Sequence, residues 1–340
     1  MNHFLILFLI IFILNFFLFR NNHNIAFILN LFDTPNVERK FHLKPTPLNG
    51  GIFYFLNLII IFIYDFFFYD STISLFFELK NEIIFIYFLV INFILLSLGI
   101  IDDKLSIRPL SKTLISLIIF IAFLIMNKDF QIIKLKFESF DKEIDLFEIS
   151  FIFTVISFAT LQICLNMYDG MNLQSSIYYK VLILFFLVIS NDPGLQLFCL
   201  FTLIYLLFFS FYNYRGLIFF GDNGVYIFSF IISLIVIKLY NSTNSLNVEN
   251  ILIIFLFPFL DLIRLFLYRL RKNLNPFEAD RSHIHHILLK RYGLVKTNLI
   301  IISPLIVSML LFHLLKMNLI LLIIVNFIIY IFIIKQKVND

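Results

Sequence analysis

Apolar runs of membrane-spanning length recur along the whole chain and constrain its fold more than any other feature. A helix needs about 20 apolar residues to cross the hydrocarbon core of a bilayer. Eleven runs approach this length, at 4–19, 50–69, 83–101, 111–127, 147–165, 176–190, 195–212, 223–240, 250–270, 298–315 and 318–334. The chain is 61% hydrophobic and 14% charged, which leaves too few charges for the surface of a soluble domain. The sequence therefore predicts an all-α polytopic integral membrane protein with about 11 transmembrane helices.

No soluble domain or internal repeat interrupts these runs, so we expect residues 1–340 to form a single membrane-embedded domain. The first run lacks a basic segment before it and a small-residue cleavage site after it, which favours a retained helix over a removed signal peptide. Cys164 and Cys199 both lie in apolar runs, and we expect buried thiols there instead of a disulfide.

The distribution of Lys and Arg predicts the orientation in the membrane, because cytoplasmic loops carry the excess of positive charge. Of the 26 basic residues, 19 fall on one side if that side holds 20–49, 102–112, 166–180, 213–222, 264–297 and the tail 335–340. We expect this side to be cytoplasmic, with the N-terminus outside and the C-terminus inside. Residues 128–146 are then external, and the alternation over 130–137 predicts a small β-hairpin near 130–146.

Two adjacent carboxylates, Asp102 and Asp103, end the run 83–101 at the expected water boundary. Their mutual repulsion is relieved by a divalent cation or by basic partners. A charged stop at a helix end is the alternative, although positive residues are more usual there on the cytoplasmic side. Lys112 follows at the start of the next helix, where it either meets a phosphate or anchors the helix in the membrane.

The first cytoplasmic loop combines the basic residues Arg39 and Lys40 and three prolines with His42 and a glycine pair, Gly50 and Gly51. Paired glycines at a helix start permit close backbone approach and contact of free N–H groups with an anion. A plain basic loop with a helix-start turn explains the pattern equally well.

Two further polar segments fall on the same side. Asn166 and Asp169 are three residues apart and share a face if the helix continues to Asp169, before Gly170 ends it. A capped helix end is the alternative. Asp222 stands just before the run 223–240, where a carboxylate that caps the helix is the simpler explanation.

The most distinctive segment follows the run 250–270, which Pro258 and Asp261 are expected to interrupt. Three of the seven histidines, His283, His285 and His286, fall within four positions. A zinc site is one interpretation, since His-rich tracts bind metal. No cysteine lies nearby, and the oxygen-rich surroundings favour magnesium or phosphate.

All these polar segments lie on one predicted face of the membrane. Carboxylates that bind Mg²⁺, surrounded by basic groups, are the equipment of phosphoryl transfer. Acids at the bilayer interface also suit a reaction between a water-soluble substrate and a lipid phosphate.

These segments together resemble a known family, the polyprenyl-phosphate N-acetylhexosamine-1-phosphate transferases of glycosyltransferase family 4, which are related to the phospho-N-acetylmuramoyl-pentapeptide transferase. Five blocks carry the resemblance in order: Asp33-x-Pro-Asn through Arg39-Lys40-x-His42 to Pro47-x-x-Gly-Gly51; Asp102-Asp103 with Lys112; Asn166-x-x-Asp169-Gly170; Phe219-x-Gly-Asp222-x-Gly224; and Pro276-Phe through Asp280-Arg281-x-His-Ile-His-His286. The last block resembles the N-acetylhexosamine branch.

The resemblance implies that N-acetylhexosamine-1-phosphate passes from a UDP-sugar to undecaprenyl or another polyprenyl phosphate, with release of UMP and with Mg²⁺ (or Mn²⁺) as cofactor. By the same resemblance, the metal ligands are Asp222 and Asp169. The catalytic set is Asp102, Asp103, Asp169, His283, His285 and His286. The substrate-binding set is Arg39, Lys40, His42, Lys112, Asn166, Gly170, Met171, Asn172, Asn213, Phe219 and Arg269.

The expected partners are the UDP-sugar donor, the lipid acceptor and the bilayer, with a homodimer left open and no nucleic acid. The expected location is the bacterial inner (cytoplasmic) membrane, with the active site on its cytoplasmic face, at the start of envelope polysaccharide or O-antigen-type lipopolysaccharide synthesis. The alternatives are a transferase of the pentapeptide type and a non-enzymatic or transport protein of the membrane.

Two positions depart from the family pattern. Asn172 stands where a second Asp is usual, and Leu173 replaces the Gly that follows it. After Asp222, the sequence Asn223-Gly224-Val225 replaces Ser-Gly-Ser. Because Asn still coordinates and forms hydrogen bonds, we expect an altered sugar or nucleotide preference and not a loss of activity.

Overall fold

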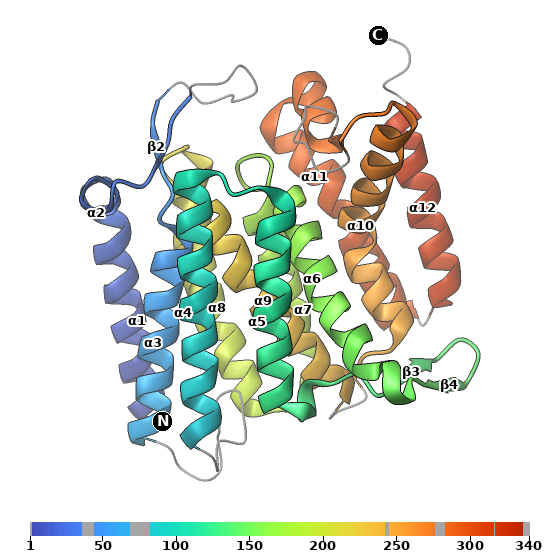
Figure 1. The fold of residues 1–340 in the computed structure, drawn as a ribbon, viewed down its shortest axis with the longest axis horizontal. Helices are drawn as coiled ribbons and strands as arrows, with labels where there is room; N and C mark the ends of the chain where they lie inside the picture. The colour runs from blue at the N-terminus through green and yellow to red at the C-terminus, as the bar shows by residue number, and fades with distance from the viewer. Residues whose placement is uncertain are drawn as a thin grey trace.

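The computed structural model describes residues 2–35, 44–68, 82–241, 245–275, 283–315 and 317–335, and most of them are helical (Figure 1). The helices are α1 (Asn2–Arg20), α2 (Asn22–Leu29), α3 (Gly50–Phe68), α4 (Glu82–Leu105), α5 (Pro109–Met126), α6 (Ser150–Tyr168), α7 (Gln174–Ile189), α8 (Pro193–Tyr214), α9 (Gly221–Asn241), α10 (Val248–Arg271), α11 (Ile284–Leu315) and α12 (Leu319–Lys335). Strand β1 (Phe32–Asp33) pairs with β2 (Thr46–Pro47), and β3 (Lys134–Phe137) pairs with β4 (Lys142–Asp145), both antiparallel. The helical fold and the predicted hairpin are confirmed.

Each of the eleven predicted runs coincides with a helix, and α2 is an additional short one. Among the described residues, eight helices are long and apolar enough to cross a membrane. The pair α1 and α2, bent by 68°, would make a ninth span, whereas α7 and α12 are shorter apolar helices. The protein is therefore a multi-pass membrane protein, and the count of eleven spans stays a prediction.

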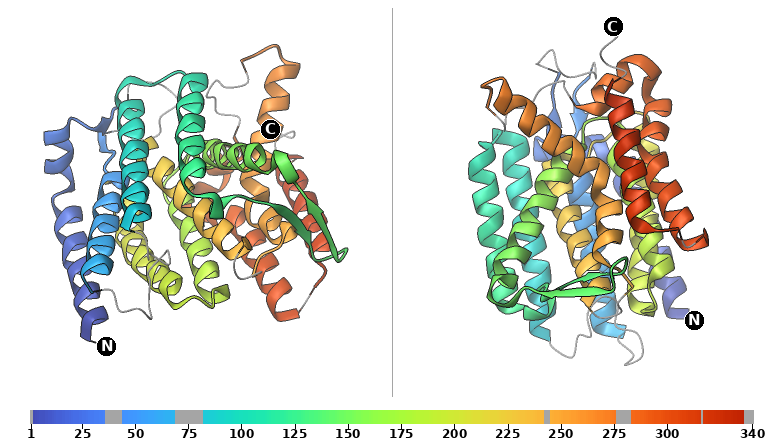
Figure 2. Two further views of the ribbon diagram at one scale, coloured as in Figure 1. Left: turned by 60° about the horizontal axis from the view of Figure 1, so that its bottom comes forward. Right: turned by 90° about the vertical axis from the view of Figure 1, so that its right-hand side faces the viewer.

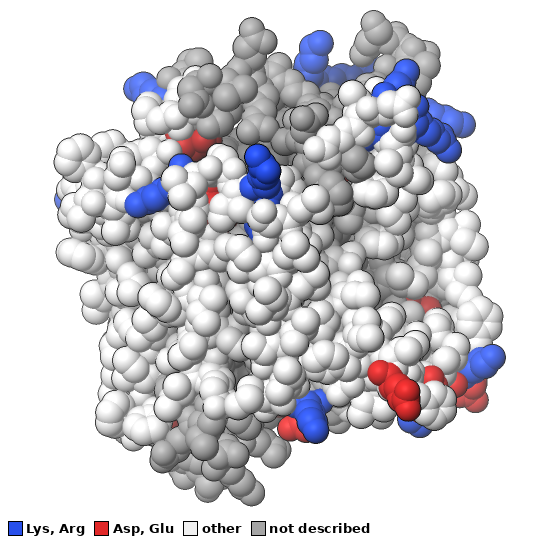
Figure 3. Space-filling view, viewed as in Figure 1, with Lys and Arg blue, Asp and Glu red and all other residues white. Residues whose placement is uncertain are grey.

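Where the structure describes them, the segments that were grouped by their positive charge lie at one end of the bundle. The α4–α5 connection, β2 and the start of α11 are at the top of Figure 1, whereas the start of α1 and the β3–β4 hairpin are at the bottom. The right-hand view of Figure 2 shows the same separation from the side. In Figure 3, most of the visible Lys and Arg side chains gather towards the top, and acidic and basic groups mix near the hairpin. Which end faces the cytoplasm stays a prediction.

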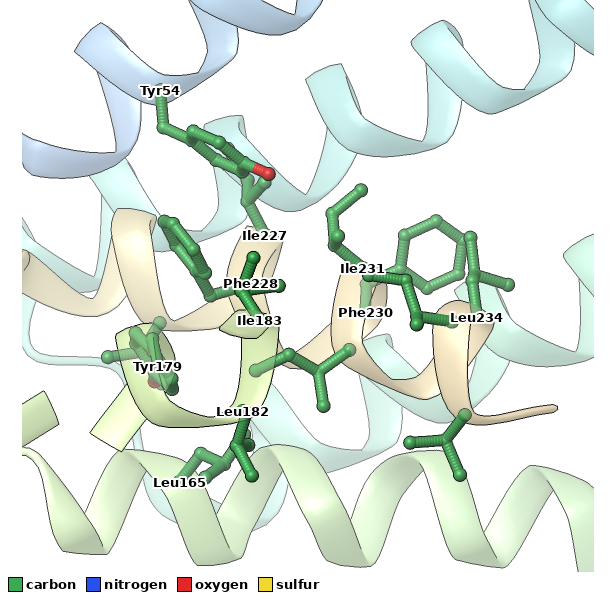
Figure 4. Packing of buried hydrophobic residues seen from close by; sticks show 14 of the residues in the cluster. Tyr54, Leu165, Tyr179, Leu182, Ile183, Ile227, Phe228, Phe230, Ile231 and Leu234 are labelled. Carbon is green, nitrogen blue, oxygen red and sulfur yellow. The ribbon is translucent and has the colours of Figure 1, made fainter. Parts of the chain in front are cut away.

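Helix α9 forms the centre of the bundle. In an 18-residue apolar stretch of this helix, 94% of the residues are buried inside the protein, and the helix packs against α3, α4 and α6. Figure 4 shows how the Phe228 ring lies between Tyr54 of α3 and Tyr179 of α7; the ring centroids are 4.1 and 4.8 Å away. Stacked rings of this kind bury a large apolar area with defined geometry. The helix is therefore held on several sides.

Two glycines allow neighbouring helices to reach the first turn of α9. A Cβ atom at Gly99 of α4 would lie 2.2 Å from the Cα of Asn223, and one at Gly51 of α3 would lie 2.4 Å from its carbonyl carbon. No side chain fits at such distances, so backbones touch directly there. The close approach predicted for Gly50 and Gly51 is confirmed: Gly51 meets α9 at Asn223, and Gly50 meets the backbone of Phe219 and Phe220 just before α9. Contact of their N–H groups with an anion stays a prediction.

Helix α10 continues through Pro258 and Asp261, so the predicted interruption of this run is wrong. Proline has no N–H and leaves the carbonyl four residues earlier without its helical donor. The Tyr178 hydroxyl of α7 donates to that carbonyl, on Ile254, at 2.8 Å.

Residues 284–297, predicted as part of a loop, are the first turns of α11, which is kinked at Gly293 (φ 73°). Cys164 and Cys199 are buried free thiols, as predicted.

Candidate active site

Asp102 lies in the last turns of α4, with only 3% of its surface exposed. Its carboxylate accepts hydrogen bonds from Lys112 Nζ of α5 at 2.8 Å and from the Tyr226 hydroxyl of α9 at 2.7 Å. The backbone N–H of Ile107 donates a third, at 2.9 Å. A buried carboxylate is stable only with such partners. Asp102 therefore joins α4, α5 and α9 at one point and holds the lysine in place.

Asp103, the neighbouring acid, caps the N-terminus of α9 from outside that helix. Its carboxylate accepts from the backbone N–H groups of Asp222 at 2.8 Å and Asn223 at 3.2 Å. The side-chain amide of Asn223 donates to the same group. The first N–H groups of a helix have no partner within it and carry the positive end of its dipole. Asp103 therefore fixes the position of the turn that carries Asp222, and a direct role in transfer stays a prediction.

Asp222 is more accessible than Asp102, with 28% of its side chain exposed against 2%. It accepts a hydrogen bond from the side-chain amide of Asn166 at the end of α6. Lys112 Nζ lies 3.6 Å from its other oxygen, so this lysine stands between Asp102 and Asp222. Four helices thus bring two carboxylates, one amide and one cation together, as the separate sequence segments predicted.

Asp169 follows the last turn of α6, and its surroundings make it hard to ionise. Burial raises the pKa of Asp169 to about 6, and the neighbouring Ser175 hydroxyl offsets part of that rise. A carboxyl group with such a pKa exchanges its proton readily for a metal ion near neutral pH. This property is compatible with its predicted role as a second metal ligand.

The loop after Asp169 is fastened to two other helices. Asn213 of α8 accepts from the backbone N–H of Leu173 at 2.6 Å, and Asn298 of α11 donates to the carbonyl of Asn172 at 3.1 Å. Leu173 itself has a left-handed backbone (φ 69°), which glycine adopts without strain. Asn213 was predicted to bind substrate, and in the structure its side chain holds this loop.

Three other predicted substrate contacts lie in the packed parts of the same end. Met171 packs at the edge of the apolar core, and Arg269 of α10 is buried with 1% of its surface exposed. The backbone of Phe219 donates to the carbonyl of Pro47 at 2.9 Å and accepts from Gly50 at 3.2 Å.

The three histidines lie at the start of α11, with their rings in contact. The His283 and His285 rings stack at 5.2 Å, and His286 lies edge-on to His285 at 4.2 Å. His285 is 2% exposed and fills the place of a side chain at Gly170, where a Cβ atom would lie 1.9 Å from its Nε2. Because Gly170 follows Asp169, this contact joins the histidine segment to the loop after α6.

One group of three side chains in the described part of the chain has the spacing of a metal site: Asp261, His283 and His285 offer atoms within 4.8 Å of one another. Asp261 is already occupied, because Arg264 lies 2.6 Å and His283 Nδ1 3.1 Å from its two oxygens. A guanidinium on the same carboxylate opposes a bound cation. Asp222 fits magnesium better, since this ion binds one or two carboxylates and completes its shell with water and substrate phosphates.

Several predicted residues lie outside the described part of the chain, namely Arg39, Lys40, His42, Pro276, Phe277, Asp280 and Arg281. Sequence reasoning also missed residues that the structure brings to the site. Tyr226 lies one helical turn after Asp222, and this spacing could have indicated that the two side chains share a face of the helix. Gln174 and Asn298, which contact His285 and Asn172, gave no signal of their own.

Known proteins are similar to this chain in sequence. A model of glycosyl transferase family 4 matches residues 85–240, which run from α4 to α9 and include Asp102, Asp103, Lys112, Asp169 and Asp222. Asp261 and the three histidines lie outside this match. The chain is 25% identical over 292 residues to the undecaprenyl-phosphate alpha-N-acetylglucosaminyl 1-phosphate transferase of Salmonella typhi, a match that covers 82% of this chain and 74% of the relative.

The protein of the same name from Escherichia coli strain K12 is 24% identical over 288 residues, with 81% of this chain and 73% of the relative covered. That of Pasteurella multocida is 31% identical over 86 residues, which cover 25% of this chain and 24% of the relative. The resemblance carried by the sequence blocks is thereby confirmed: this multi-pass membrane protein is similar to glycosyl transferase family 4 over residues 85–240, and over most of its length it is similar to proteins named undecaprenyl-phosphate alpha-N-acetylglucosaminyl 1-phosphate transferase.

Proposed function

We propose that the protein transfers N-acetylhexosamine-1-phosphate from a UDP-sugar to undecaprenyl phosphate and releases UMP. The observation that carries this proposal is the position of Lys112 between Asp102 and Asp222, at the meeting point of α4, α5, α6 and α9. The named relatives act on undecaprenyl phosphate, which fits a site at the end of a membrane bundle. A cation flanked by carboxylates suits a reaction in which negative phosphates must approach one another.

In the proposed reaction, an oxygen of the lipid phosphate attacks the phosphorus that bears the sugar. The new P–O bond forms as the bond from that phosphorus to the bridging oxygen breaks, and UMP leaves with the bridging oxygen and its electron pair. Lys112 holds phosphate oxygens, and Asp102 keeps the lysine in position. Asp103 keeps the first turn of α9 fixed, so that Asp222 faces the substrates at a constant distance.

Asp222 is the proposed principal ligand of Mg²⁺, and Asp169 is the proposed second ligand. The donor chemistry fits, because Asp222 is a partly exposed carboxylate that contacts Asn166 and Lys112 and lies beside the Asp102 carboxyl group, and Mg²⁺ prefers such oxygen ligands. Bound Mg²⁺ would neutralise the diphosphate oxygens and stabilise the departing UMP.

The predicted setting completes the proposal. UDP-sugars are cytosolic, so the charged end of the bundle would face the cytoplasm from the bacterial inner membrane. The excess of Lys and Arg in the loops at this end supports that orientation. The product would initiate an envelope polysaccharide.

The test is an assay of purified protein with radiolabelled UDP-sugars, undecaprenyl phosphate and Mg²⁺. Formation of a labelled lipid together with an equal amount of UMP is expected with at least one UDP-N-acetylhexosamine. Lys112→Met removes the cation at similar size and should abolish transfer, whereas Lys104→Met, an exposed lysine of the same region, should not. If no UDP-sugar yields labelled lipid, or if the lysine at position 112 is dispensable, the proposal is wrong.

A further inference from the structure

A buried polar cluster between α10, α11 and α12 lies outside the group of acids described above. Its centre is Asp261 of α10, with 6% of its surface exposed. One carboxylate oxygen accepts from Arg264 at 2.6 Å and from the Tyr330 hydroxyl of α12 at 3.0 Å. The other oxygen lies 3.1 Å from Nδ1 of His283 and 3.4 Å from the backbone N of Ile284. Both oxygens therefore have partners: a guanidinium and a phenol hydroxyl on one, and an imidazole and a backbone N–H group on the other.

The first oxygen carries the partners that keep the carboxylate in place. A buried carboxylate without a cation is strongly unfavourable, and Arg264 supplies that cation. The Tyr330 hydroxyl also accepts a hydrogen bond from Arg264 Nε at 3.1 Å, so each of the three side chains is hydrogen-bonded to the other two. The Asp261 side chain cannot rotate without breaking contacts to both α10 and α12.

The second oxygen faces the start of α11. It orients the His283 ring through Nδ1, and this leaves Nε2 as the ring nitrogen for another partner. Carboxylates that hold a working histidine by one ring nitrogen occur widely at enzyme sites, where they set its tautomer and direction. His285 is placed differently, because Gln174 contacts its Nδ1 at 3.4 Å and its ring is seated on Gly170.

We propose that Asp261 is a positioning residue, which holds His283 so that its Nε2 contacts the sugar nucleotide, while His285 fastens the histidine segment to the loop after α6. This inference rests on the proposed function, because it assigns His283 to the donor of that reaction. Two contacts connect His283 to the acids of the site. The His283 ring stacks on His285, and His285 packs against Gly170, which follows Asp169.

The test measures kcat and KM for Asp261→Asn, His283→Ala and the double variant in the transfer assay. Asp261→Asn keeps the size of the side chain and removes its charge, and kcat should fall by about 10- to 100-fold, as for other carboxylates that orient a histidine. The KM for the lipid acceptor should stay unchanged. In the His283→Ala background, Asp261→Asn should lower kcat by no more than about threefold further, because residues that act as a unit are not additive.

Two more variants separate positioning from packing. Tyr330→Phe removes one hydrogen bond to Asp261, keeps the ring and should lower kcat several-fold without loss of folded protein. Asn326→Leu removes the buried contact to Ser308 at 2.6 Å between α11 and α12, and should change thermal stability without changing kcat.

The outcomes are distinct. If the wild-type protein is active, two results overturn this inference and leave the proposed function standing. One is that the losses in kcat are additive in the double variant. The other is that Asp261→Asn and Asn326→Leu change kcat equally. Absence of transfer by the wild-type protein overturns the proposed function and this inference with it. If Asp261→Asn does not fold, an unchanged kcat in Tyr330→Phe overturns the inference, and a several-fold loss supports it.

Discussion

Replacement of Gly99 by alanine tests whether the fit of α4 on α9 sets the geometry of the site. The new Cβ atom would lie 2.2 Å from Cα and 2.4 Å from the backbone N of Asn223. Two carbon atoms are comfortable at about 3.5 Å, so the helices must part by more than about 1 Å. Backbone atoms of a central helix cannot rotate away as a side chain can. The separation moves Asp103 away from the N–H groups of Asp222 and Asn223.

The magnitude follows from these contacts. Overpacking of this kind costs about 1–3 kcal/mol of stability. A displacement of about 1 Å at a catalytic group can lower the rate by about 10²-fold. We therefore expect Gly99→Ala to lower both the thermal unfolding midpoint and the rate of labelled lipid formation, with the larger effect on the rate.

Ser97→Ala is the matched control on the same helix. The Ser97 hydroxyl donates to the carbonyl of Phe93 in its own helix at 2.8 Å, and it makes no hydrogen bond to another helix among the described residues. Its loss should change stability by less than about 0.5 kcal/mol and leave the rate unchanged. Equal midpoints and equal rates for Gly99→Ala and Ser97→Ala would refute the reasoning, because a tolerated Cβ means that the helices do not touch there.

Four further results are expected. Asp222→Asn should abolish Mg²⁺-dependent UMP release while membrane yield is retained; near-normal turnover would contradict the metal assignment. Gly170→Ala should displace His285 and cost at least about tenfold in rate; unchanged turnover would contradict that seating. Asn172→Asp should shift the preference among UDP-sugars in competition assays, and an identical profile would count against it. Burial raises the pKa of Asp169 to about 6, so a proton competes with the metal below that pH. The Mg²⁺ concentration for half-maximal rate should rise by at least about tenfold from pH 7 to pH 5, and by clearly less in Asp169→Asn; an equal rise in the variant would contradict the role of Asp169 as a ligand.

The sequence was sufficient for the helices and for the end of the bundle at which the polar segments meet. Apolar length and charge asymmetry are properties of single segments, so they can be read without knowledge of contacts between segments. The approach of Gly50 and Gly51 to another backbone was one of two interpretations of the paired glycines, and only the structure decides between it and a plain helix-start turn.

The partners of each side chain were not predictable. Nothing in the sequence shows that Asp103 faces the first turn of α9, 119 residues later, and not a substrate. The same holds for Asp261, whose contacts come from α11 and α12. Pro258 suggested a break in its helix, but the Tyr178 hydroxyl on α7 satisfies the freed carbonyl and the helix continues. Each of these outcomes depends on tertiary neighbours.

The enclosure of α9 bears on how the protein is made. A helix with 94% of the residues in its 18-residue apolar stretch buried offers little surface to lipid, so it reaches its final contacts only when its neighbours are already in the bilayer. Its first turn carries Asp222, while Lys112 and Asn166 come from helices synthesised earlier. Nascent chains that stop before α9 is seated thus have no competent centre, and catalysis begins only once assembly is complete.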